Sequence, residues 1–247
     1  MRAVRILLIV AVILGGLFVV ADRFAVGLAE DEVAEQLKTS EGLTATPDVS
    51  IKGFPFLTQV ASGELDDVEV GIKNYEAKAT GSGDAADTIR IANLTASMHG
   101  VAFSSDYSSA TAATATGTAT VAYDELLKAA KSEPTDVGFG TTARVTGLSD
   151  GGNGKIKVQV EVDPPAFGPQ TVSVLSTVSV KNDKVEVHAD SLPAVSGLSL
   201  AEDAVRSITD FQQSIDDLPG DIKLDKVEAA KDGVQITVKG SDIRLAG

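Results

Sequence analysis

The sequence contains no cysteine and no tryptophan, and only two of its 247 residues are histidine. Without cysteine the chain forms no disulfide, no thiolate metal site and no thiol nucleophile. His99 and His188 stand in separate stretches that alternate polar and apolar residues, so a metal site of paired imidazoles at helical spacing is absent. We therefore expect two surface or hydrogen-bonded histidines, and we predict no metal ligand and no cofactor.

Basic residues are also scarce, with 21 Lys and Arg against 35 Asp and Glu, which gives a formal net charge of −14. Affinity for nucleic acid depends on clustered Lys and Arg, so nucleic acid is excluded as a partner. The same deficit disfavours adhesion to anionic lipid through a basic surface.

Familiar catalytic motifs are missing as well. Serine is abundant, but the G-x-S-x-G turn of serine hydrolases does not occur. The glycines of Gly138-Phe139-Gly140 lack the spacing and the strand-to-helix setting that phosphate binding requires. We predict no catalytic residues and a protein that is not an enzyme.

One long apolar run stands at the N-terminus, where Arg2 and Arg5 precede the uncharged residues 6–21 and Asp22 follows. Its length of about 16 residues lies between a signal-peptide core of about 7–15 and a comfortable membrane span of about 17–25. Residues 1–21 are therefore either a signal peptide cleaved after Ala21 or an uncleaved membrane anchor. In both cases the positive charge before the run places the rest of the chain in the cell envelope, outside the cytoplasmic membrane.

The periodicity of the remaining chain predicts an α+β fold, with residues 22–247 forming a single extracytoplasmic domain. Helical spacing of apolar residues over 22–39 predicts an amphipathic helix that presents Val26, Ala29, Val33 and Leu37. From Val49 onward, several stretches alternate with period two and favour β-branched residues, as strands do. Long helical crossovers between them are missing, so we expect a mostly antiparallel sheet.

Two more helices and a hairpin complete the expected order. Residues 123–131 predict a short helix, and residues 199–217 a long one that begins with the capping-box pattern of Ser199 and Glu202. The long helix has an apolar stripe that includes Ile208 and Phe211. A closing hairpin is expected around Asp232-Gly233.

The stretch "GFPFLTQ", residues 53–59, concentrates bulky apolar residues in a chain that is only 4% aromatic. Proline has no N–H to donate, so the stretch is expected to end a strand and cross a sheet edge. Its apolar residues either seal the edge of a core or face something apolar outside the protein. In the second case the rim of a lipid slot consists of Phe54, Pro55, Phe56 and Leu57, with Thr58 and Gln59 free to hydrogen-bond a headgroup.

A strand expected within residues 108–123 has one shallow face. Thr114, Thr116, Thr118 and Thr120 lie on one side, and Ala115, Gly117 and Ala119 lie on the other. The space above such a face is filled either by a closely packed helix or by a ligand. If the ligand is an acyl chain, these small residues line the slot together with Ile208 and Phe211.

Three features of this sequence carry a family resemblance: "GFPFLTQ" followed by Gly63 and the strand "VEVGI", the apolar run that continues into an amphipathic helix, and the C-terminal order "DLPG" then "DKVEAAKDGVQITVKGSDIRL". With them the chain resembles the LmeA-type phospholipid-binding proteins of actinobacterial cell envelopes. The resemblance implies a phospholipid partner, phosphatidylinositol in one family member, and support of mannan elongation in lipoglycans. It also implies a likeness to tubular lipid-binding domains of the BPI type, in which a curved antiparallel sheet wraps a long helix.

Two other function classes stay open. One is a membrane-anchored structural adaptor, in which side chains fill any cavity, and the other is a hydrolase or transferase that acts on envelope glycolipids. The sequence identifies no protein partner for any of the three.

Overall fold

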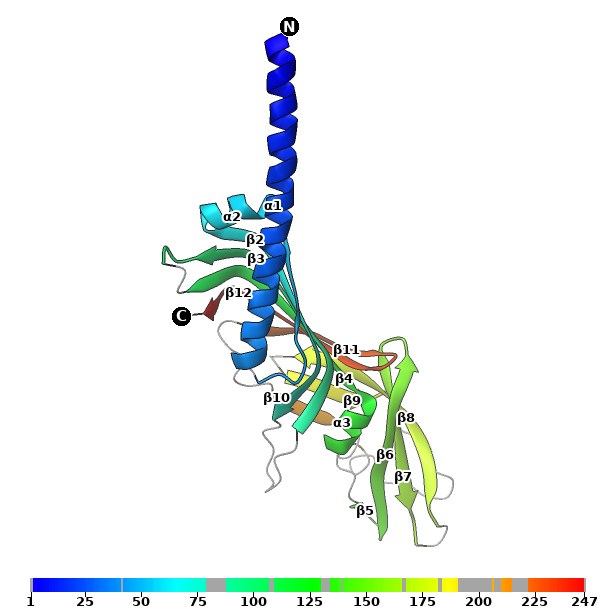
Figure 1. Ribbon diagram of the computed structural model, residues 1–247. Coiled ribbons are helices and arrows are strands. Elements are labelled where there is room, and N and C mark those ends of the chain that lie inside the picture. The colour runs from blue at the N-terminus through cyan, green and yellow to red at the C-terminus, as the bar shows by residue number, and fades with distance from the viewer. Residues whose placement is uncertain are drawn as a thin grey trace. The chain divides into compact units, whose positions relative to one another are not determined.

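A computed structural model describes residues 2–40, 42–78, 88–106, 109–129, 134–138, 140–165, 168–181, 184–190, 206, 210–214 and 222–246. The chain forms two compact units, and Figure 1 follows its elements from blue at the N-terminus to red at the C-terminus. Unit 1 comprises residues 1–73, 95–116 and 240–247, and unit 2 comprises residues 74–94 and 117–239.

The described elements are few helices and many strands. The helices are α1 (Arg2–Ser40), α2 (Phe56–Ser62) and α3 (Tyr123–Ala129). The strands are β1 (Asp48–Lys52), β2 (Glu64–Lys78), β3 (Thr88–Phe103), β4 (Ala110–Ala122), β5 (Thr135–Gly138), β6 (Thr141–Gly152), β7 (Lys155–Asp163), β8 (Gln170–Lys181), β9 (Lys184–Ala189), β10 (Phe211–Ser214), β11 (Lys223–Ala230) and β12 (Gly233–Ala246). One sheet has the order β1-β2-β3-β4-β12-β11 and the other the order β10-β9-β8-β7-β6-β5. The mostly antiparallel α+β fold expected from the sequence is confirmed.

The second half of α1 packs on the strands of unit 1, which curve behind it in Figure 1. Its inward face is the row Asp22, Val26, Glu30 and Ala34, spaced by four residues so that all lie on one side of the helix. The Glu30 carboxylate accepts the N–H of Ile51 at 2.7 Å, which satisfies a donor on the edge strand β1. Of the expected apolar stripe, Val26 is buried, Ala29 and Leu37 are half-buried, and Val33 is exposed.

The first half of α1 is exposed, and it is apolar from Ile6 to Val20. Its length and composition suffice to cross a membrane, a criterion that signal sequences also meet. Figure 1 shows this half extending away from the strands of unit 1, and the helix continues without a break through Ala21 and Asp22. The amphipathic helix predicted over residues 22–39 is thus the continuation of the apolar run.

The core of unit 2 lies between the second sheet, the β11–β12 hairpin and α3. In β7 the alternation predicted from the sequence buries every second residue, namely Ile156, Val158, Val160 and Val162. The Tyr123 hydroxyl on α3 donates to the carbonyl of Ala230 at the end of β11, with 2.8 Å between the oxygens. The short helix that begins at Tyr123 and the closing hairpin around Asp232-Gly233 are both confirmed.

The long helix predicted over residues 199–217 is wrong at residues 211–214, which form β10 and pair antiparallel with Lys184–Val187 of β9. Asp210, directly before β10, accepts the N–H of Ala189 at 3.0 Å, which holds this segment against the end of β9. Pairing with a neighbouring strand has therefore overridden the local helical pattern. Apart from Arg206 and Asp210, the rest of the predicted helix lies outside the described residues.

Candidate functional site

The Gly53–Gln59 stretch joins β1 to α2 in unit 1. Gly53 makes the bend after Lys52 with a φ of 96°, the Phe54–Pro55 peptide bond is cis, and α2 starts at Phe56. The helix is short and ends at Gly63, which adopts the left-handed conformation. The strand end expected at this proline is confirmed, and the short helix after it was not anticipated.

The apolar residues of this stretch divide between core and surface. Phe56 is only 7% exposed and packs in the core of unit 1, which also contains Val26 and Ile51. Phe54 is 58% exposed and Leu57 is 37% exposed. Phe56 therefore seals the core, whereas the side chains of Phe54 and Leu57 face outward, and their role as the rim of a lipid slot stays a prediction.

Both polar atoms of the Gln59 side-chain amide form hydrogen bonds within the protein. Its Oε1 accepts the N–H of Asp66 at 2.7 Å, and its Nε2 donates to the carbonyl of Lys52 at 3.4 Å. The buried Gln59 thus joins α2 to the end of β1 and the start of β2. Pro55 is half-buried and Thr58 is exposed, so among the polar candidates for a headgroup contact Thr58 is the accessible one.

We expect Gly53→Ala to lower the free energy of unfolding by about 3 kcal/mol, through left-handed strain and a clash. A Cβ at this position would lie 2.5 Å from Gln59 Nε2 and 2.7 Å from Asp66 Oδ2. The matched control is Gly63→Ala, where φ is also positive but no atom lies within 4 Å of the added Cβ, so a cost of about 1 kcal/mol is expected. Urea unfolding of both variants measures the difference, and equal losses would contradict the packing described for Gly53.

Asp22, at the end of the apolar run, fixes the start of α2. Its carboxylate is 0% exposed, and Oδ1 accepts the N–H of Leu57 at 2.8 Å. Pro55, the residue that precedes α2, supplies no side-chain cap, so a carboxylate from α1 satisfies the helix start in its place. Because this bond joins residues 35 positions apart, no local signal in the sequence could have revealed it.

Arg23 covers the exposed aromatic ring of the same stretch. Its guanidinium carbon lies 5.3 Å from the centroid of Phe54, within the range of a cation–π contact. One guanidinium nitrogen donates to Asp22 at 2.6 Å and to the carbonyl of Gly53 at 3.4 Å. Two adjacent residues of α1 thereby hold both the start of α2 and the outward-facing Phe54.

The other predicted lipid-contacting residues belong to other elements of the chain. Ala115 belongs to unit 1, whereas Gly117 and Ala119 belong to unit 2. All residues from Ala115 to Thr120 are half-buried, so neither face of this part of β4 is fully covered. Ile208 lies outside the described residues; Phe211 lies in β10, and its side chain is likewise outside them.

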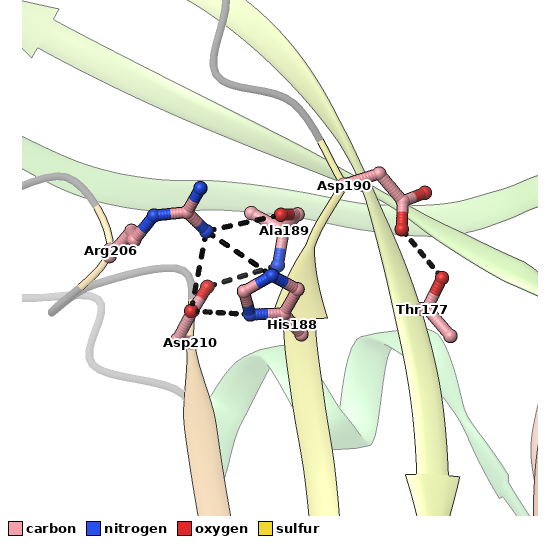
Figure 2. A network of polar contacts seen from close by, with 6 residues as sticks. All are labelled: Thr177, His188, Ala189, Asp190, Arg206 and Asp210. Carbon is pink, nitrogen blue, oxygen red and sulfur yellow. Dashed lines mark hydrogen bonds and ion pairs between the residues drawn. The ribbon is translucent and has the colours of Figure 1, made fainter. Parts of the chain in front are cut away.

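His188 sits in a polar network at the edge of the second sheet (Figure 2). Its Nδ1 donates to Asp210 at 2.8 Å, and its Nε2 faces an Arg206 nitrogen at 3.4 Å. Arg206 also donates to the carbonyl of Ala189. Since both ring nitrogens are engaged, the arrangement joins the segment before β10 to the end of β9, and the exposed, partnered histidine predicted here is confirmed.

The other histidine is exposed as well, and its Nδ1 faces the Asp67 carboxylate. Within the described part of the chain, no group of three or more His, Asp or Glu side chains is arranged to hold a metal ion.

Asp190, next to the network in Figure 2, should make the stability of the folded protein vary with pH in the acid range. The Lys155 ammonium at 2.7 Å and the Thr177 hydroxyl at 2.6 Å hold the pKa of Asp190 below its ordinary value, although burial opposes them. A lowered pKa in the folded state contributes stability above the unfolded pKa of about 3.9, and this stability is lost as pH falls through the folded value. The melting temperature of the unsubstituted protein is therefore expected to fall more steeply below about pH 4 than that of Asp190→Asn. Asp242→Asn, at an exposed position, is the control, and identical pH profiles for all three proteins would contradict this account.

A family model described as LmeA-like phospholipid-binding matches residues 20–239. No curated protein and no solved structure matches the chain. The matched region includes the second half of α1, the Gly53–Gln59 stretch and most of both sheets.

Proposed function

Because the chain belongs to the LmeA-like phospholipid-binding family, we propose that it is a phospholipid-binding protein of the cell envelope without chemistry of its own, held at the outer face of the cytoplasmic membrane by α1. The family match over residues 20–239 carries this proposal. The family is one of phospholipid-binding proteins and not a known enzyme family. The exposed apolar half of α1 supports the location at a membrane.

The outward-facing side chains of the Gly53–Gln59 stretch are the proposed rim of the lipid site. Phe54 and Leu57 are apolar and accessible, and Thr58 beside them carries an exposed hydroxyl. Phe56 and Gln59 support this rim from inside the protein. An apolar rim can touch a bilayer while a lipid passes, and it does so without the basic surface that this acidic chain lacks.

The small residues Ala115, Gly117 and Ala119 of β4 are the proposed contacts of the acyl chains. These residues are small and half-buried, which supports them as contacts of methylene groups. Each methylene kept from water contributes about 0.8 kcal/mol, so a lipid held outside the bilayer needs protein contacts that cover its acyl chains. That residues 22–247 act as one lipid-binding domain stays a prediction.

The proposed ligand is of the phosphatidylinositol type, and the proposed process is mannan elongation of lipoglycans. Both rest on the resemblance carried by "GFPFLTQ" and by the C-terminal segment. The matched family description names phospholipid alone. The headgroup is therefore a question for a binding experiment.

Photocrosslinking in vesicles tests the proposal. The full chain is reconstituted with a phospholipid that carries a photoactivatable group on its acyl chain, and crosslinked peptides are mapped by mass spectrometry. We expect crosslinks within β4 and within residues 53–59, reduced by unlabelled phosphatidylinositol more than by phosphatidylcholine. Crosslinks confined to residues 6–21 would contradict lipid binding by the folded units and would favour a structural adaptor.

A further inference from the structure

The apolar surface of α1 continues past Ala21 on one side of the helix. Phe24 is 70% exposed and Leu28 is 56% exposed. They are four residues apart, so their side chains neighbour each other along the helix. Asp22 and Val26, on the opposite side of the same turns, face the folded part of unit 1.

Two exposed side chains of the α2 region are tied to these turns. The N–H of Leu57 donates a hydrogen bond to Asp22, and the ring of Phe54 contacts Arg23. We call the four exposed apolar residues the interfacial corner: Phe24, Leu28, Phe54 and Leu57. These residues belong to two segments of the chain, and both segments lie at the turns of α1 that follow the apolar run.

Length favours a membrane as the partner of this surface. At about 1.5 Å per residue, residues 6–21 span about 24 Å, which is short of the hydrocarbon core of about 30 Å. Continued to Leu28, the apolar side of the helix spans about 35 Å, which is sufficient. The next exposed charges are the acids Asp31 and Glu32, which mark where the surface becomes polar.

Asp22 and Arg23 are the two charged residues within residues 6–28, and neither opposes the placement of this part of α1 in a bilayer. The Asp22 carboxylate is fully covered and hydrogen-bonded, so lipid would not meet its charge. Arg23 is 48% exposed, and its guanidinium is paired with the Asp22 carboxylate at 2.6 Å, so the two charges compensate each other.

From continuity with α1, from length and from charge, we infer that the interfacial corner lies in the outer leaflet of the bilayer that α1 spans. The inference rests on the proposed function in one respect, the retention of α1 as a membrane anchor. It goes further because it fixes the depth and orientation of α2 and makes unit 1 lie on the membrane surface. The rim residues Phe54 and Leu57 would then meet lipid directly.

Depth-dependent quenching tests the inference, and the absence of cysteine makes single-cysteine labelling direct. The full chain is reconstituted in vesicles of phosphatidylcholine with phosphatidylglycerol, and an environment-sensitive fluorophore is attached to Leu28→Cys, Phe54→Cys, Val19→Cys or Glu32→Cys. Spin-labelled phospholipid then quenches fluorophores that lie in the bilayer. We expect Leu28→Cys and Phe54→Cys to be quenched at least about threefold more than Glu32→Cys, with Val19→Cys reporting insertion of α1.

Each other outcome overturns the inference in a distinguishable way. If Val19→Cys is quenched but Leu28→Cys and Phe54→Cys behave like Glu32→Cys, the corner lies outside the bilayer while the anchor stands. If Val19→Cys is not quenched, α1 does not span the bilayer, and the anchor of the proposed function fails as well. If the fluorophore on Phe54→Cys is shielded only at high protein density and without quenching by lipid, a second copy covers the corner.

Discussion

Phe56→Ala is expected to lower the free energy of unfolding by about 3–4 kcal/mol, because it empties a buried site in the core of unit 1. The ring packs in the cluster that includes Val26 of α1 and Ile51 of β1, so its loss loosens the contact between helix and sheet. Chemical unfolding of residues 22–247, followed by circular dichroism, measures the effect.

Phe54→Ala is the matched control, because it removes the same side chain two positions earlier. That ring is largely exposed and loses mainly its contact with Arg23, so a cost below about 1 kcal/mol is expected. Equal costs for the two variants would contradict the division of the stretch between core and surface.

The double substitution Phe54→Ser with Leu57→Ser is expected to slow the uptake of phospholipid about tenfold. Full burial of such a side chain contributes about 1.5–3 kcal/mol, and the loss of about 1.4 kcal/mol already corresponds to a factor of ten. The partly exposed pair should therefore matter for contact with the bilayer and little for folding. Transfer of a fluorescent phospholipid from donor vesicles to residues 22–247 gives the rate.

Leu175→Ser is the control for this experiment, since Leu175 is a comparably exposed leucine on β8 of unit 2. It should leave uptake unchanged. The proposed rim would be wrong if the double variant kept its melting temperature and took up lipid at the original rate. An equal loss in Leu175→Ser would also contradict it, because the effect would then not be specific to this stretch.

The elements that the sequence predicted well are those whose signal is local. The alternation in β7 and the turn residues Asp232-Gly233 are sufficient on their own to specify a strand and a hairpin. The helix predicted at Phe211–Ser214 was wrong. The helical spacing of this segment is a local signal, whereas its pairing with β9 is a contact with another part of the chain. Secondary structure at this sheet edge is therefore decided by tertiary contacts.

The candidate site could be predicted only in part for the same reason. The sequence identified Gly53–Gln59 as the notable stretch, but not which of its residues point inward. That division depends on where α2 begins, and α2 begins at Phe56 with its start bonded to Asp22. The side chains that position the site, Asp22 and Arg23, appeared in the sequence only as the charges that end an apolar run.

The residues of "GFPFLTQ" fall into two groups in the structure. Gly53, Phe56 and Gln59 build the junction of β1, α2 and β2, so these residues are required by the fold. Phe54, Leu57 and Thr58 are accessible and available for a partner. Substitutions in the first group should act on stability, and those in the second group on lipid handling.

Native mass spectrometry of residues 22–247, isolated from their own envelope without detergent and followed by organic extraction of the same sample, tests the central claim most directly. The account predicts a stoichiometric phospholipid on the protein, with an inositol headgroup in the extract. A bare protein that also takes up no phospholipid from vesicles would contradict it.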